Sequence, residues 1–213
     1  MKNILFVLSL GLILSIGSCQ KDSRIDKSEL TVVDDSYLLE GDKFTGVAYE
    51  NYTNGKVKNE WTLSAGILNG PFSSHYSDGK VDESLYWKDG LKDGPYEKHY
   101  SNGQLQVKAQ YALNEKDGYF EVFYEDGKLW KKGYYDNGKL DGPIETYYKN
   151  GQVSISLTWK QNLKEGPYQE YFENGQVKIT GYFKNDLRDG TFERYMENGD
   201  LEEETTYEKG RKI

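Results

Sequence analysis

The sequence predicts an all-β protein: an elongated, single-layer antiparallel β-meander built from seven 24-residue β-hairpin repeats. Two glycine series carry this prediction. One recurs every 24 residues from Gly46 to Gly190. The other falls nine residues later in each unit, from Gly55 to Gly199, and each of its members follows Asn or Asp. Asn-Gly between alternating runs is a strong hairpin signal, and a fixed period indicates a repeat architecture.

The first eighteen residues differ from the rest of the chain. They hold one lysine and then an apolar run that ends in small residues, the layout of a secretory signal peptide. Cys19 follows directly, and Ile16-Gly17-Ser18-Cys19 resembles the lipobox of bacterial lipoproteins. That resemblance implies cleavage before Cys19 and its lipidation. We therefore expect a Gram-negative outer membrane lipoprotein, periplasmic or surface-exposed, with a lipid anchor in the membrane. The alternative is a plain cleaved signal.

Two short segments separate the signal from the repeats. Residues 19–30 are polar and charged, which predicts a flexible tether between lipid and folded body. Residues 31–45 keep the phase of the repeat, because Val33 and Leu39 fall where the next unit has Val57 and Leu63. We expect this stretch to be a half-repeat that caps the N-terminal end of residues 46–213.

Each unit is expected to be a strand, a two-residue type I′ turn at Asn-Gly, and a second strand. A longer polar connection then leads to the next unit. Such a turn fixes the cross-strand register. The expected pairs are Tyr100 with Leu105, Tyr124 with Leu129, Glu97 with Lys108, Glu121 with Lys132, Phe120 with Gly133, and Tyr168 with Gly181.

Alternation along the strands assigns most large side chains to one face, together with the Val or Leu that follows each Asn-Gly turn. A single sheet has no second layer, so part of this face is a candidate binding surface. The residues chosen for it are Tyr76, Tyr100, Tyr124, Tyr148, Tyr96, Phe120 and Tyr168. Three interpretations stay open: a core covered by the sheet itself, a surface for a protein partner, or a row of rings that stacks on glycans.

No residue set suggests catalysis, a metal or a cofactor. His75 and His99 occupy a repeat position that other units fill with aromatic residues, so we interpret them as substitute aromatics. Equivalent strands lie ~9.6 Å apart, much farther than Zn–N bonds of ~2.0–2.1 Å allow. The acidic residues that directly precede the glycines of the Gly46 to Gly190 series, which we call the unit glycines, are interpreted as turn formers. The net charge of −8 argues against nucleic acid as a partner.

The turn strings, the Val or Leu after them and the late aromatic of each unit resemble the MORN repeat variant. The resemblance covers residues 46–213 and implies an elongated, twisted β-meander. It also carries the label of YwqK-type antitoxin-family proteins. We expect a membrane-anchored, non-enzymatic repeat scaffold that mediates protein–protein interaction at the bacterial cell envelope. The alternatives are an envelope glycan- or peptidoglycan-binding module and an antitoxin-like protein.

Overall fold

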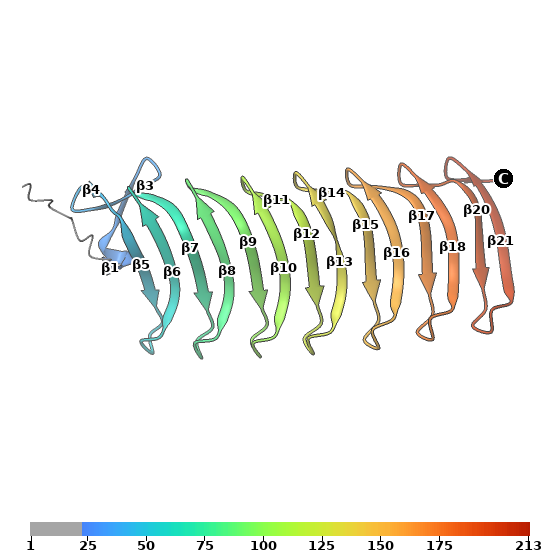
Figure 1. Ribbon diagram of the computed structural model, residues 1–213, viewed down its shortest axis with the longest axis horizontal. Helices are drawn as coiled ribbons and strands as arrows, with labels where there is room; N and C mark the ends of the chain where they lie inside the picture. Colours follow the sequence, from blue (N-terminus) through green and yellow to red (C-terminus); the bar gives the residue numbers. More distant parts are fainter. Residues whose placement is uncertain (1–22) are drawn as a thin grey trace, which may run out of the picture.

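The computed structural model describes residues 23–213 and contains one large open sheet of consecutive antiparallel hairpins. The hairpins stand side by side in a single layer along the molecule (Figure 1). The seven hairpins are β5 (Gly46–Asn51) with β6 (Val57–Ser64), β7 (Ile67–His75) with β8 (Val81–Lys88), β9 (Leu91–His99) with β10 (Leu105–Ala112), β12 (Gly118–Phe123) with β13 (Leu129–Asp136), β15 (Gly142–Tyr147) with β16 (Val153–Lys160), β17 (Leu163–Tyr171) with β18 (Val177–Lys184), and β20 (Gly190–Tyr195) with β21 (Leu201–Glu208). The predicted fold class is confirmed. The predicted signal peptide and Cys19 lie outside the described residues.

The glycines that recur every 24 residues, from Gly70 to Gly190, mark a bulge in the first strand of each hairpin after the first. Gly94 and Gly118 have φ of +114° and +95°, a conformation that favours glycine. In three units the bulge divides the strand, which leaves a two-residue strand before the longer one. These short strands are β11 (Glu115–Lys116), β14 (Lys139–Leu140) and β19 (Leu187–Arg188). The last strand, β22 (Arg211–Lys212), pairs with the end of β21.

The two kinds of turn are the reverse of the prediction. At Asn102-Gly103, the Tyr100 carbonyl accepts the Gly103 N–H at 2.8 Å, and the Tyr100 N–H donates to the Gln104 carbonyl at 2.8 Å. Gly103 has φ +91°, whereas Asn102 does not have a positive φ. This is a three-residue loop, a type I turn followed by a left-handed glycine, and the predicted type I′ turn is wrong here. The Asn102 side chain accepts the Gln104 N–H at 2.8 Å, which favours this form.

Tight two-residue turns stand where longer connections were predicted. Lys88 pairs with Leu91, and Asp89 and Gly90 between them have φ of +51° and +81°. Positive φ at both central residues defines the type I′ turn. Every strand of the array is therefore joined to the next by a short hairpin loop.

The register agrees with the prediction only away from the Asn-Gly turns. The expected pairs Glu97–Lys108, Glu121–Lys132, Phe120–Gly133 and Tyr168–Gly181 are confirmed. Near the turn, a bulge shifts the register by one residue, so that His99 lies opposite Leu105 and Phe123 opposite Leu129. The predicted pairs Tyr100–Leu105 and Tyr124–Leu129 are wrong.

This shift moves a whole row of side chains to the other face of the sheet. Directly opposed residues point to the same face. The Val or Leu after each Asn-Gly turn therefore lies with the aromatic residue opposite it, as in the pairs His75–Val81 and Tyr147–Val153. The prediction that this Val and Leu row shares a face with Phe120 and Tyr168 is wrong.

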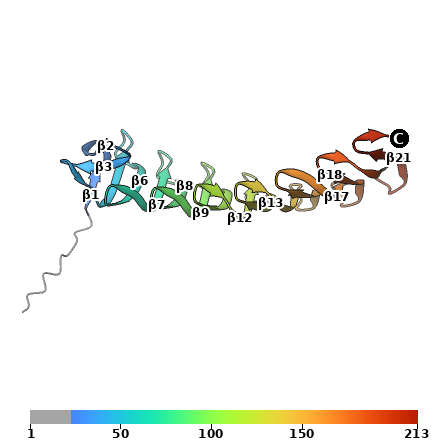
Figure 2. The ribbon, with the colours of Figure 1, turned by 90° about the horizontal axis from the view of Figure 1, so that it is seen from above.

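The N-terminal end is more ordered than predicted. Within the expected tether, β1 (Arg24–Asp26) pairs in parallel with β5, and η1 (Lys27–Glu29) follows as a short 3₁₀ helix. The next residues form a separate sheet of β2 (Thr31–Val33), β3 (Ser36–Leu39) and β4 (Asp42–Lys43). Seen from above, this sheet sits at the end of the single-layer array (Figure 2). Phe44, Ala48 and Leu63 are buried between the two.

None of the described helices is long and apolar enough to cross a membrane.

Candidate binding faces of the repeat array

One face of the sheet is covered by its own side chains, and we call it the packed face. Its central row runs straight across the strands. It consists of Ala48, Trp61, Phe72, Leu85, Tyr96, Ala109, Phe120, Gly133, Ile144, Leu157, Tyr168, Gly181, Phe192 and Thr205. Ala109 is only 2% exposed, and Phe120 and Ile144 are each 5% exposed. A single sheet thus contains a buried core without a second layer.

A second row of rings, two residues along each strand, provides the cover. Ring centroids lie 4.8 Å apart for Phe120 and Tyr135, and 5.4 Å apart for Phe192 and Tyr207. Gly133 makes room for this packing, since a Cβ there would lie 2.8 Å from Ile144. Ring pairs at these distances stabilise a protein by ~0.5–1.5 kcal/mol beyond the area that they bury.

Tyrosine hydroxyls join each unit to the next near the Asn-Gly turns. Each donates a hydrogen bond to a backbone carbonyl 23 residues later, at 2.6–2.8 Å. We call these bonds the tyrosine stitches. The donors Tyr52, Tyr76, Tyr100, Tyr124 and Tyr148 reach the carbonyls of His75, His99, Phe123, Tyr147 and Tyr171.

These contacts account for all seven residues chosen as a binding surface from the sequence. Tyr76, Tyr100, Tyr124 and Tyr148 make stitches and are half-buried. Tyr96, Phe120 and Tyr168 lie in the central row of the packed face. Burial raises the pKa of Tyr168 to about 12, assisted by a hydrogen bond to Glu170. None of the seven is exposed, so their role in binding stays a prediction and their visible role is packing.

The acidic residues before the unit glycines make contacts typical of turns. Glu165 accepts the Asn185 N–H at 2.8 Å, and Asp141 accepts the Gln161 side chain at 2.9 Å. Each carboxylate thus holds the turn of the next hairpin. Within residues 23–213, no group of three or more His, Cys, Asp or Glu residues is arranged to hold a metal ion.

The two histidines take the place of aromatic residues in their row. His75 and His99 lie opposite Val81 and Leu105, where the corresponding pair two units after His99 is Tyr147 and Val153. The Nδ1 atoms of both histidines are buried, and neither has a hydrogen-bond partner among the described residues.

The opposite side, which we call the open face, carries a row that the sequence analysis missed. Tyr86, Tyr119, Tyr134 and Tyr182 are 37–48% exposed. The same row also contains the four prolines of the chain, all of which are exposed. They are Pro71, Pro95, Pro143 and Pro167. Pro71 lies opposite Tyr86, Tyr119 opposite Tyr134, and Pro167 opposite Tyr182.

A polar row runs beside these exposed rings along the centre of the open face. Its members are Glu60, Ser73, Ser84, Glu97, Lys108, Glu121, Lys132, Glu145, Ser156, Gln169, Thr180, Glu193 and Glu204. In its middle, the Lys132 ammonium lies 2.8 Å from the Glu145 carboxylate and holds the pKa of that carboxyl below its usual range. Tyr119 donates to Glu121 at 3.1 Å, and burial together with this bond raises the pKa of Tyr119 to about 12.

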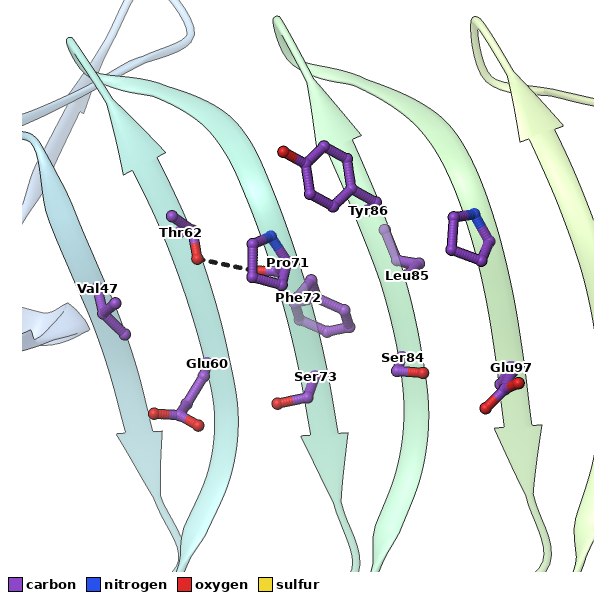
Figure 3. A pocket seen from close by; sticks show the side chains of 11 residues that line it. Val47, Glu60, Thr62, Pro71, Phe72, Ser73, Ser84, Leu85, Tyr86 and Glu97 are labelled. Atoms are coloured by element: carbon purple, nitrogen blue, oxygen red, sulfur yellow. Dashed lines mark hydrogen bonds between the residues drawn. The ribbon is translucent and has the colours of Figure 1, made fainter.

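Two hollows form between the polar row and the exposed rings. The larger, of ≈ 570 Å³, lies over β5 to β9, and Tyr86, Pro71, Glu60 and Glu97 are among its lining residues (Figure 3). The smaller, of ≈ 380 Å³, includes Tyr119, Tyr134 and Pro143 in its lining. Exposed tyrosines beside carboxylates are suited to contacts with another molecule rather than to internal packing.

Fold and faces together define an open β-hairpin repeat protein with one self-packed face and one exposed face. The chain belongs to the MORN repeat variant family, whose model matches residues 92–112, 116–137, 140–161, 164–185 and 188–209. Repeats of this family indicate a scaffold for protein or membrane interaction. A comparison with curated proteins finds no match.

Proposed function

We propose that this protein is a membrane-anchored, non-enzymatic scaffold of the bacterial cell envelope that binds a protein partner along its open face. The exposed row of Tyr86, Tyr119, Tyr134 and Tyr182 carries the proposal. Tyrosine is enriched at protein interfaces because it offers a large apolar ring and a polar tip. The packed face is a poorer candidate, since its rings already contact one another.

The non-enzymatic part of the proposal is supported by the layout of the polar groups. Catalysis requires a nucleophile, a base or an electrophilic group to converge on one point. On the open face the carboxylates and lysines follow one another across strands in a line, as in Glu97, Lys108, Glu121 and Lys132. Such a line suits recognition of an extended surface. No cofactor is part of the proposal.

The anchor is proposed from Cys19, whose surroundings resemble a lipobox. Three acyl chains would hold the chain firmly, because each buried CH₂ contributes ~0.8 kcal/mol. The variant Cys19→Ala should leave the membrane fraction or accumulate with its signal uncleaved. Fractionation of cells with metabolic labelling by a fatty acid analogue measures both results. Unchanged attachment and labelling would refute the anchor.

Photo-cross-linking in living cells tests the binding face. A benzophenone amino acid replaces Tyr134, which is 48% exposed on the open face, or Trp130, which is 46% exposed. Trp130 is the matched control because its ring lies against Tyr124, 6.1 Å between centroids, on the packed side. We expect a discrete cross-linked protein from position 134 that is absent from position 130. Equal products at both positions, or none at 134, would contradict the proposal.

A glycan-binding module of the envelope is the second candidate. It is favoured by the exposed rings of Tyr119 and Tyr134, which lie side by side with 5.2 Å between centroids and can stack on sugar rings. Binding to purified peptidoglycan separates the two candidates. Retention of the protein by peptidoglycan, reduced in Tyr119→Ala and Tyr134→Ala, would favour the glycan. An antitoxin role, suggested by the family label alone, would instead place a toxin in the cross-linked product.

A further inference from the structure

The larger hollow of the open face combines an exposed ring with carboxylates. Its floor holds Ser73 and Ser84, which lie opposite each other on β7 and β8. Glu60 and Glu97 stand at the two ends of this short row, on β6 and β9. Along the side, the ring of Tyr86 lies near Pro71, as Figure 3 shows. The small serines leave the space open, and the larger side chains surround it.

Glu97 carries a charge that its neighbours leave unpaired. Lys108 lies opposite it in the register, yet within residues 23–213 no Lys or Arg nitrogen lies within 4.0 Å of the Glu97 carboxylate. Farther along the same row, Lys132 and Glu145 do form an ion pair. A half-buried carboxylate next to an exposed tyrosine favours a cationic ligand, and the net charge of −8 favours its approach.

The open face already holds one arginine in this way. The Arg24 guanidinium lies 5.0 Å from the centroid of the Tyr49 ring and 2.5 Å from a Glu60 oxygen. Tyr49 lies directly opposite Glu60, the first member of the polar row, and so on the same face. Arg24 belongs to β1, a short extended segment at the edge of the sheet. An extended segment can therefore deliver a guanidinium to a tyrosine and a carboxylate of this face.

We propose that the larger hollow binds an arginine side chain presented by an extended segment of the partner protein. This inference rests on the proposed function and names the chemistry of the partner. The guanidinium pairs with Glu97 and stacks on Tyr86, which lie on adjacent strands at diagonal positions, ~7–8 Å apart. Arginine suits both contacts better than lysine, because its guanidinium is planar, weakly hydrated and able to form two parallel hydrogen bonds with a carboxylate.

Fluorescence anisotropy with the full chain and labelled peptides tests the site. One probe is a twelve-residue peptide of alternating Thr and Arg, and the other has Lys in place of every Arg. We expect the arginine peptide to bind at least ~5-fold more tightly than the lysine peptide. Glu97→Gln should weaken its binding ~10-fold, the size expected for a charge-assisted hydrogen bond, and Tyr86→Ala ~3-fold or more.

Two matched variants are the controls. Trp130 lies on the packed side and is 46% exposed, close to the 43% of Tyr86, and Glu83 is a half-buried carboxylate on the packed side of β8, two residues from Leu85. Trp130→Ala and Glu83→Gln should leave the binding unchanged. Equal affinity for both peptides, or equal losses in the test and control variants, would overturn the inference, and so would no binding at all.

Failure of this inference and of the proposed function give different results. If the arginine peptide does not bind but the benzophenone at position 134 still cross-links a protein, only the arginine site is overturned. The partner is then recognised by another chemistry. If the cross-link also disappears, the binding role of the open face is overturned as well.

Discussion

A single hydroxyl group explains the tyrosine that follows the first strand of the hairpin in five of the seven units. It donates to a carbonyl of the neighbouring unit at 2.6–2.8 Å, at the point where the regular ladder is interrupted by a bulge. Buried carbonyls without a partner are costly, so the tyrosine compensates for the bulge. In the last two units the position is Phe172 and Met196, neither of which has a hydroxyl to donate.

Removal of one stitch should destabilise the chain measurably. Tyr124→Phe deletes the 2.8 Å bond to the Tyr147 carbonyl while it keeps the ring. We expect the free energy of unfolding in urea to fall by ~0.5–1.5 kcal/mol. The control is Tyr134→Phe, since that exposed hydroxyl makes no hydrogen bond among residues 23–213. If both variants lost the same stability, the stitch would have no special role.

At this scale the sequence predicts which residues recur but not what they touch. The period identified Tyr76, Tyr100, Tyr124 and Tyr148 as one set, yet exposure was assigned to them because a single sheet lacks a second layer. The structure shows that rings of two adjacent rows on the packed face cover one another, as Phe120 and Tyr135 do. The open-face row could have been found from the residue after each unit glycine, such as Pro71 or Tyr119, by the same alternation.

The turns are the elements in which sequence and structure differ most. Asn-Gly suits a type I′ turn, and it suits a three-residue loop equally when the Asn side chain bonds to the backbone two residues on, as Asn102 does. Local sequence does not separate these alternatives, and the one-residue difference decides which face receives Leu105 and Val153. The predicted number of hairpins and the predicted strand pairing away from the Asn-Gly turns are correct, because both depend on the repeat period alone.

Five two-residue turns place a residue other than Gly, Asn or Asp at a positive φ, and Leu113 is the bulkiest apolar residue among them. Leu113 has φ +50° at the first central position of a two-residue turn and is 67% exposed. A left-handed conformation costs such a residue ~1–2 kcal/mol, whereas Asn tolerates it. Leu113→Asn should therefore raise the free energy of unfolding by ~1 kcal/mol.

Urea denaturation measures this gain, and the same substitution at another exposed leucine is the control. Leu187 is 47% exposed in β19 and does not have a positive φ. Leu187→Asn should give no gain in stability. A gain of equal size in both variants would mean that loss of exposed apolar surface, rather than relief of backbone strain, is responsible.

At the scale of the whole molecule, contacts run almost entirely between neighbouring units. Stability of such an array is approximately a sum of unit and interface contributions. The buried cluster around Phe120 spans only adjacent hairpins, and a second cluster around Phe44 ties the small N-terminal sheet to the first hairpin. No contact of residues 23–213 folds the array back on itself in Figure 1 or Figure 2.

Small-angle X-ray scattering should find an elongated particle. Two strand spacings per unit give ~9.6 Å, so seven units should span ~67 Å. The pair-distance distribution should show a long tail beyond the peak set by the cross-section. A symmetric distribution, typical of a compact globule, would contradict the extended array.

The tyrosine stitch has a further consequence for how such a protein changes its size. Five of the six junctions between units use the same bond over the same 23-residue separation. If residues 118–141 were deleted, the Tyr100 hydroxyl would meet the carbonyl of Tyr147 in place of that of Phe123, and the junction would be the same. The array can therefore become longer or shorter by duplication or loss of whole units, while the contacts at the junctions between units stay the same.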